Sequence, residues 1–361
     1  MMKTPFLTRA IATAIFATGL SNQALSKEHN SHPGPVARVI DLPVTTQGPL
    51  WPPAEVVNDQ GHFVLIGTAL ESDREGNVAP VPQQALLVSK HTVPPLDDAG
   101  VESPALGGAP YSVIRPLDLS AGSADLDMVL HANSYGPANG PGGRPSIPRQ
   151  GETTYNLNGA GVVCRDVFPA ESQADVYTRP SLPLQEVPIY GFTGDGKRHD
   201  VDSGEALAQL EPVVDQRRAS PITLGDWLSA DGQLKVQLTG RTADGSYTGA
   251  SFDFRLDNLI PNGLYTVWAV RGRGPDALAM PNVITTDAQG SAQASFLVSN
   301  PFPEGNSDLR IRGVAIVYHS DHQTWGGCFS RFGPGVDAHG VFNTLKAAGP
   351  NPFADFVTVA P

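Results

Sequence analysis

A period of two in the apolar residues constrains the second half of the chain more than any other feature. In residues 234–238 and 252–256, apolar side chains alternate with polar ones. Successive side chains of a strand point to opposite faces, so each run predicts a strand with one buried face. Leu264–Arg271 and Arg310–Tyr318 are apolar on both faces, which is typical of central strands. Several strands at regular spacing without an intervening helix predict an antiparallel β-sandwich.

The first half of the chain carries shorter β-rich runs that are separated by clusters of proline and glycine. The chain has 38 glycines and 33 prolines, well above the average combined share of about 12%, which favours turns and short strands. The expected fold class is therefore mainly β, with a sandwich in the C-terminal half and an irregular β-rich N-terminal unit. The expected boundaries are 1–26 for a signal peptide, 27–215 for the irregular unit, 216–345 for the sandwich and 346–361 for a tail.

The N-terminus has the pattern of a secretory signal peptide. Two basic residues precede an apolar run at 11–20 that is too short to span a bilayer. Small residues at Ala24 and Ser26 fit a cleavage site after Ser26, and cleavage after Ala24 is the competing choice. We therefore expect a periplasmic or secreted protein.

The charge disfavours two classes of partner. The formal net charge is −12, and it becomes −14 once the two basic residues of the signal are removed. This balance argues against nucleic acid and anionic membranes as partners. No later run is apolar for long enough to form a transmembrane helix, so no membrane insertion is expected. The remaining partner classes are an unknown small ligand or a protein.

The chain has two cysteines, Cys164 and Cys328. In an exported protein an even count most simply indicates one disulfide, which we expect between these two residues. By the chain-entropy model a bridge over so long a loop stabilises the fold by about 5 kcal/mol.

A resemblance covers residues 221–340. The order LDNLIPNGLYTVWAV, NVITTDAQGSAQASF and GVAIVYHSDHQTWG resembles secreted bacterial β-sandwich domains of unassigned function. More distantly it is similar to copper-zinc superoxide dismutase and chordin-type domains. This resemblance implies the sandwich fold. It does not imply dismutase chemistry, because the expected H-x-H ligand pair on the central strand is replaced by Thr266, Val267 and Trp268.

Residues 308–340 contain more side chains that could bind a metal or take part in catalysis than any other stretch, including three histidines and a cysteine. The histidines follow an apolar strand or return after a glycine-rich loop, and with a carboxylate they would suit zinc or copper. Because a strand exit and a returning loop often meet at one rim of a sandwich, we expect the first and last of them to approach one another. The alternative is a hydrogen-bonded histidine at the strand end with the others exposed. The candidate metal ligands are His319, Asp321, His322 and His339, and the candidate pocket residues are Tyr318 and Trp325.

A second copper site depends on the cleavage position. Cleavage after Ser26 would expose Lys27, Glu28 and His29. A free amine two residues before a histidine supplies the square-planar nitrogen set that Cu(II) favours. The alternative is a solvated N-terminal segment whose third residue happens to be His29.

The sequence lacks the common hydrolase, zinc-protease, phosphate-loop and C-x-x-C motifs. Our leading hypothesis is an exported noncatalytic β-sandwich protein that binds a metal or small ligand at the 319–339 loop. One alternative is a small metal-dependent oxidoreductase or hydrolase that uses copper or zinc. The other is a structural or cell-surface interaction protein.

Overall fold

The fold is described from a computed structural model. The chain divides into two units, Met1–Pro33 and Gly34–Pro361, and every described residue belongs to the second. The described residues are 36–48, 54–72, 74–75, 78–89, 112–132, 155–157, 160–162, 182–187, 220–272, 274–305, 308–320, 322 and 338–360.

The first sheet, sheet A, has four antiparallel strands in the order β1-β9-β10-β14. Phe252 of β10 pairs with Val236 of β9 on one side and with Phe296 of β14 on the other. Along β9, buried and exposed residues alternate as the period of two predicts. The bounds are β1 Ala37–Asp41, β9 Asp231–Arg241, β10 Tyr247–Asp257 and β14 Ala292–Ser299.

The second sheet, sheet B, has the order β12-β11-β15-β16, and β13 also pairs with β11. All seven residues of β15 are buried, as are the first seven of β11. Both strands are therefore central and covered on both faces, as their apolar sequences indicate. The bounds are β11 Leu264–Arg271, β12 Gly274–Ala277, β13 Val283–Thr285, β15 Gly313–His319 and β16 Ala338–Asn343.

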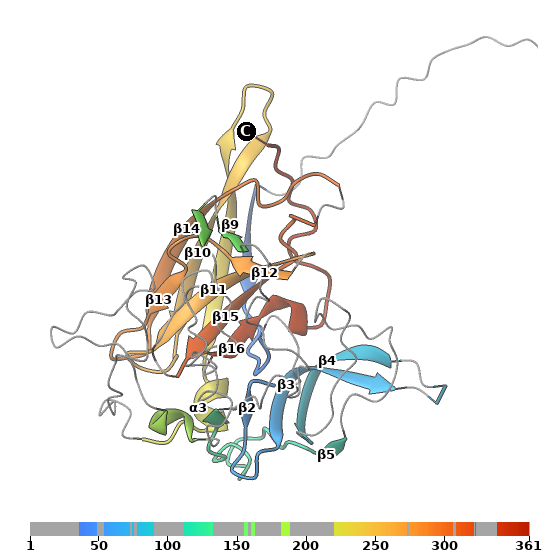
Figure 1. The fold of residues 1–361 in the computed structure, drawn as a ribbon, viewed down its shortest axis with the longest axis vertical. Coiled ribbons are helices and arrows are strands. Elements are labelled where there is room, and N and C mark those ends of the chain that lie inside the picture. The colour runs from blue at the N-terminus through green and yellow to red at the C-terminus, as the bar shows by residue number, and fades with distance from the viewer. Residues whose placement is uncertain are drawn as a thin grey trace, which may run out of the picture. The chain divides into compact units, whose positions relative to one another are not determined.

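Sheets A and B form an antiparallel β-sandwich with one shared core. Phe252 and Phe254 of sheet A belong to the same buried cluster as Val267, Ile316 and Tyr318 of sheet B. Figure 1 labels the strands of the two sheets except β1. The opposite face of sheet B is also buried and forms a separate apolar cluster. The expected fold class, mainly β with a sandwich in the C-terminal half, is confirmed.

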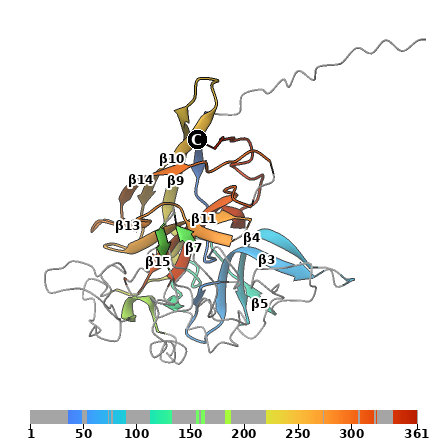
Figure 2. The same cartoon turned by 45° about the horizontal axis from the view of Figure 1, so that its top comes forward.

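A third antiparallel sheet, sheet C, comes from the N-terminal half and has the order β5-β4-β3-β2-β6. Figure 2 shows β3, β4 and β5 beside one another. Val64 and Ile66 of β3 face the shared core, whereas Phe63 and Leu65 face a smaller cluster. The bounds are β2 Val56–Val57, β3 Phe63–Ser72, β4 Val78–Val88, β5 Val113–Pro116 and β6 His131–Ala132, and a separate pair is formed by β7 Tyr155–Leu157 and β8 Ala160–Val162.

The described helices are short. Helix α3, Leu224–Leu228, has Thr223 as its N-cap, and a capping box formed by Thr223 and Asp226 satisfies its first backbone donors. Trp227 of this helix is buried, and its indole Nε1 donates to the Thr45 carbonyl at 2.8 Å. The 3-10 helices are η2 Leu184–Glu186 and η6 Thr344–Lys346. No helix in the described part of the chain is long and apolar enough to cross a membrane.

The segment that was expected as a tail packs on the sandwich. Phe353 and Phe356 are fully buried beside Phe302, with ring centroids 5.9 and 5.2 Å from its ring. Strand β1, which precedes the boundary expected at 215, is likewise an edge strand of sheet A. The sandwich therefore includes chain from both sides of the expected boundaries.

Arg310 holds the C-terminal segment through backbone carbonyls. Its guanidinium donates to the carbonyl oxygens of Pro303, Phe353, Ala354 and Phe356 at 2.5–3.2 Å. Burial lowers the pKa of Arg310, with the charge of Asp355 acting in the opposite direction. A planar group with five donors fits this set of carbonyls better than a lysine ammonium does.

We expect Arg310→Lys to lower the free energy of unfolding by about 2 kcal/mol, because a lysine cannot reach all four carbonyls and leaves some of them unpaired. Urea unfolding at neutral pH measures this loss. Arg241→Lys is the matched control on an exposed residue of β9, where the change should stay within about 0.5 kcal/mol. Equal stabilities of the two variants would show that the Arg310 contacts do not hold the segment.

Candidate functional site

Strands of both sheets reach their loops at one end of the sandwich. Leu264, the first residue of β11, pairs with Thr285 at the end of β13 and with His319 at the end of β15. His319 in turn pairs with Ala338, which begins β16. The connections 258–263, 286–291 and 320–337 therefore leave from this end, which we call the loop end. Clustered loops on a rigid sandwich are a common place for binding sites.

Backbone hydrogen bonds join two of these connections, 258–263 and 286–291. The Leu259 amide donates to the Gly290 carbonyl at 3.0 Å, and the Asn262 amide donates to the Asp287 carbonyl at 2.9 Å. Gly290 has a φ of 78°, and a Cβ at this position would lie 2.1 Å from the Leu259 carbonyl oxygen. The residue must be glycine for the two loops to approach this closely. The Asp287–Gly290 turn thus joins β13 of sheet B to β14 of sheet A.

His319 lies on the face of sheet B that points away from sheet A. Its Nε2 is 2.7 Å from the Thr266 hydroxyl, which accepts a hydrogen bond from the Trp268 indole at 2.8 Å. Thr266 and His319 are at most 1% exposed. This histidine is therefore part of a buried hydrogen-bonded group at the strand end.

His339 lies on the opposite face of the same sheet, because it pairs directly with Tyr318. Its Nδ1 is 2.7 Å from the Glu55 carbonyl oxygen, and its Nε2 is 2.9 Å from the Ser320 hydroxyl. The Glu55 carboxylate accepts from the Gly340 amide at 2.6 Å. Both ring nitrogens of His339 are thus used in a buried polar group that joins the base of the 320–337 loop to the segment before β2.

These contacts assign the proton on His339. A carbonyl oxygen only accepts, so Nδ1 carries the hydrogen and donates to Glu55. Burial lowers the pKa of His339 to about 4, and the hydrogen bond to the Glu55 carbonyl acts in the opposite direction. The ring is therefore neutral at pH 7, and Nε2 accepts from the Ser320 hydroxyl. The order of donors resembles that of a serine nucleophile and its base, but Ser320 has no exposed surface, so the pair is a structural tie.

The expected meeting of His319 and His339 at one metal ion does not occur. Their backbones lie in adjacent strands, but their rings are on opposite faces of sheet B, since His339 pairs with Tyr318 and His319 with Ala338. Within the described ranges no group of three or more His, Cys, Asp or Glu side chains could hold a metal ion. Two strands of an antiparallel pair place ligands together only when the ligands share a face.

Two of the other predicted site residues, Tyr318 and His322, lie in the described part of the structure. Tyr318 is fully buried in the core, with ring centroids 5.3 Å from Tyr265 and 6.1 Å from Trp227, and so does not line an open pocket. His322 is 1% exposed, has a φ of 55°, and donates its amide to the His319 carbonyl at 3.1 Å. The remaining candidates lie outside the described residues: His29, Asp321, Trp325, Cys164 and Cys328.

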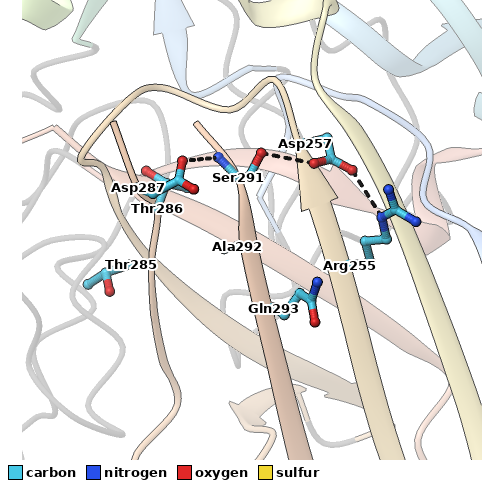
Figure 3. Close-up of a pocket in the computed structure, with 8 residues that line it drawn as sticks. All are labelled: Arg255, Asp257, Thr285, Thr286, Asp287, Ser291, Ala292 and Gln293. Carbon is cyan, nitrogen blue, oxygen red and sulfur yellow. Dashed lines mark hydrogen bonds and ion pairs between the residues drawn. The ribbon is translucent and has the colours of Figure 1, made fainter. Parts of the chain in front are cut away.

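A polar pocket of about 420 Å³ also lies at the loop end, between the end of β10, the end of β13 and the start of β14. Figure 3 shows its side chains, which come from both sheets. Sequence reasoning missed this site, because the DAQG segment beside it predicts a turn but carries no sign of a pocket. The lining residues are Arg255, Asp257, Thr285, Thr286, Asp287, Ser291, Ala292 and Gln293.

Comparison with protein families and curated proteins identifies no relative of this chain. No protein-family model matches the chain, and no curated protein matches its sequence. Function must therefore be argued from the loop end itself.

Proposed function

We propose that this chain is an exported, noncatalytic β-sandwich protein that binds a metal or small ligand at the 319–339 loop. The observation that carries the proposal is the burial of polar side chains at the base of this loop. His319, Ser320, His322 and His339 are each at most 1% exposed. Buried polar groups require specific partners, and rigidly held groups beneath a loop are suited to orient it for binding.

The residues of this region differ in their proposed roles. His339 uses both nitrogens in contacts with Ser320 and Glu55, so we assign it to the support of the loop. His322 follows the strand end, and we propose it, together with Asp321, as the ligand of a copper or zinc ion. Imidazole nitrogen suits both metals.

Metal titration of the full mature chain tests this proposal. We expect one Zn(II) or Cu(II) per chain, and we expect His322→Ala to weaken its binding at least about tenfold. His62→Ala, on the histidine directly before β3, should leave the affinity unchanged. The copper titrations are made in chains that also carry His29→Ala, so that copper cannot bind at the proposed N-terminal site. Absence of bound metal, or the same affinity in His322→Ala, would exclude the metal site.

Activity and binding measurements on the same protein distinguish the two alternative functions, a metal-dependent enzyme and an interaction protein. Turnover that depends on bound metal in an activity screen would favour the metal-dependent enzyme. A chain that binds no metal and no small ligand would favour the interaction protein.

A further inference from the structure

The pocket at the loop end has a fixed polar framework. Asp287 Oδ1 accepts from the amides of Gln289 and Ser291, each at 2.9 Å. The Ser291 hydroxyl donates to Asp257 Oδ1 at 2.9 Å, and Asp257 Oδ2 lies 3.2 Å from Arg255 Nε. Figure 3 shows Asp287, Ser291, Asp257 and Arg255 in one continuous chain of contacts. The framework connects the turn after β13 to the end of β10, and the Asp287–Ser291–Asp257 part of it ties the two segments together.

Several polar groups of the lining remain open to a ligand. Among the described residues, no hydrogen bond or ion pair engages the terminal nitrogens of Arg255, the amide of Gln293, the hydroxyl of Thr285 or the second carboxylate oxygen of Asp287. Arg255, Gln293, Thr285 and Asp287 are exposed. Arg255 and Gln293 present donors and an acceptor from neighbouring strands of sheet A, and Thr285 and Asp287 add a hydroxyl and a carboxylate from the end of β13 and the turn after it.

This mixture of groups selects a class of ligand. Each hydroxyl of a sugar both donates and accepts, and so complements a lining of guanidinium, amide, hydroxyl and carboxylate groups. An apolar molecule would leave these groups unpaired, which costs binding free energy. A cation would find Asp257 already paired with Arg255 and Ser291, and one oxygen of Asp287 already bonded to two amides.

We propose that this pocket binds a neutral saccharide unit. The ligand would lie across the end of β10 and the start of β14, with Arg255 and Gln293 donating to its hydroxyls and Asp287 accepting from them. Arg255 pairs directly with Gln293 across these strands, so the two side chains stand on the same face and can engage adjacent hydroxyls of one sugar ring. The site is separate from the metal proposed at the 319–339 loop, and it adds a second ligand class to the loop end.

Calorimetric titration of the full mature chain with three neutral saccharides, maltohexaose, cellohexaose and hexa-N-acetylchitohexaose, tests the proposal. We expect at least one of them to bind. Gln293→Ala and Arg255→Ala should each weaken that binding about fivefold, the loss that corresponds to one hydrogen bond. Both positions are exposed, so neither variant removes part of the core. Gln237→Ala is the matched control, because Gln237 is exposed on the same sheet outside the pocket.

Three outcomes would overturn the assignment: no binding of any of the three saccharides, binding that Gln293→Ala and Arg255→Ala leave unchanged, or binding of spermidine in place of the saccharides. The last would assign the pocket to cationic amines. His322→Ala should leave saccharide binding intact, so failure of the metal site and failure of the saccharide site give different results.

Discussion

The free energy of unfolding is expected to fall by about 3 kcal/mol as the pH is lowered from 7.5 to 4, because His339 is held neutral in the fold. Its pKa is about 4 in the folded protein, against an ordinary histidine pKa of 6.5. Between these values the unfolded chain binds a proton that the folded chain does not, so acid favours unfolding. The His339 contribution is therefore complete above pH 6.5 and is lost as the pH falls towards 4. The gap between the two pKa values sets its size.

The physical cause of this sensitivity is the buried pair of contacts on His339. A protonated ring would carry a hydrogen on Nε2, so the Ser320 hydroxyl could no longer donate to it. The charge would also be placed in a site from which water is excluded. Both effects act at the base of the 320–337 loop.

Denaturant unfolding at a series of pH values measures the effect. His339→Gln cannot titrate, so its stability should be lower than that of the wild type at pH 7 but nearly constant between pH 6.5 and 4.5. A variant that keeps the wild-type slope in this interval would show that another group is responsible.

The strands of the sandwich could be predicted because the local order of apolar and polar residues indicates which faces of each strand are buried. The alternation in residues 234–238 reappears as alternating burial in β9, and the continuous apolar run of Leu264–Arg271 reappears as the buried strand β11. These patterns need no knowledge of the partner strand, since each reflects how many faces of one strand are covered.

The connections between strands were harder to predict. The run Val283–Val298 has the pattern of a hairpin around its DAQG turn, and the turn does form. Its two strands nevertheless enter different sheets, because β13 pairs with β11 and β14 pairs with β10. Thr286 explains the change of direction: its hydroxyl donates to the Ile260 carbonyl and accepts from the Gly263 amide. That contact lies with the preceding loop and has no signature within the run.

The prediction that His319 and His339 lie together was wrong for a similar reason. The exit of a buried strand at His319 was predictable, but the face that His339 takes depends on its register with β15. That register includes a bulge between Ile316 and Val317, and one residue of slip moves a side chain to the other face. The contacts of His339 with Glu55 join residues 284 positions apart in the sequence, a separation that no local pattern reports.

The second large effect is expected at Trp227. Its ring is 2% exposed, meets Tyr318 edge-on at 6.1 Å, and donates through Nε1 to the Thr45 carbonyl. We expect Trp227→Ala to lower the free energy of unfolding by about 3–5 kcal/mol through the cavity it leaves. Trp227→Phe keeps most of the ring but leaves the buried carbonyl unpaired, at a cost of about 1–3 kcal/mol.

Comparison of these variants with Leu228→Ala separates the tryptophan from its helix. Leu228 is the next residue of α3 and is only partly buried against the core, so its loss should cost less than that of Trp227. Urea unfolding measures all three variants. If Leu228→Ala is as damaging as Trp227→Ala, the stability comes from the helix as a whole. If Trp227→Ala is the more damaging, the stability comes from the indole itself, which contacts the Thr45 carbonyl and Tyr318 of sheet B.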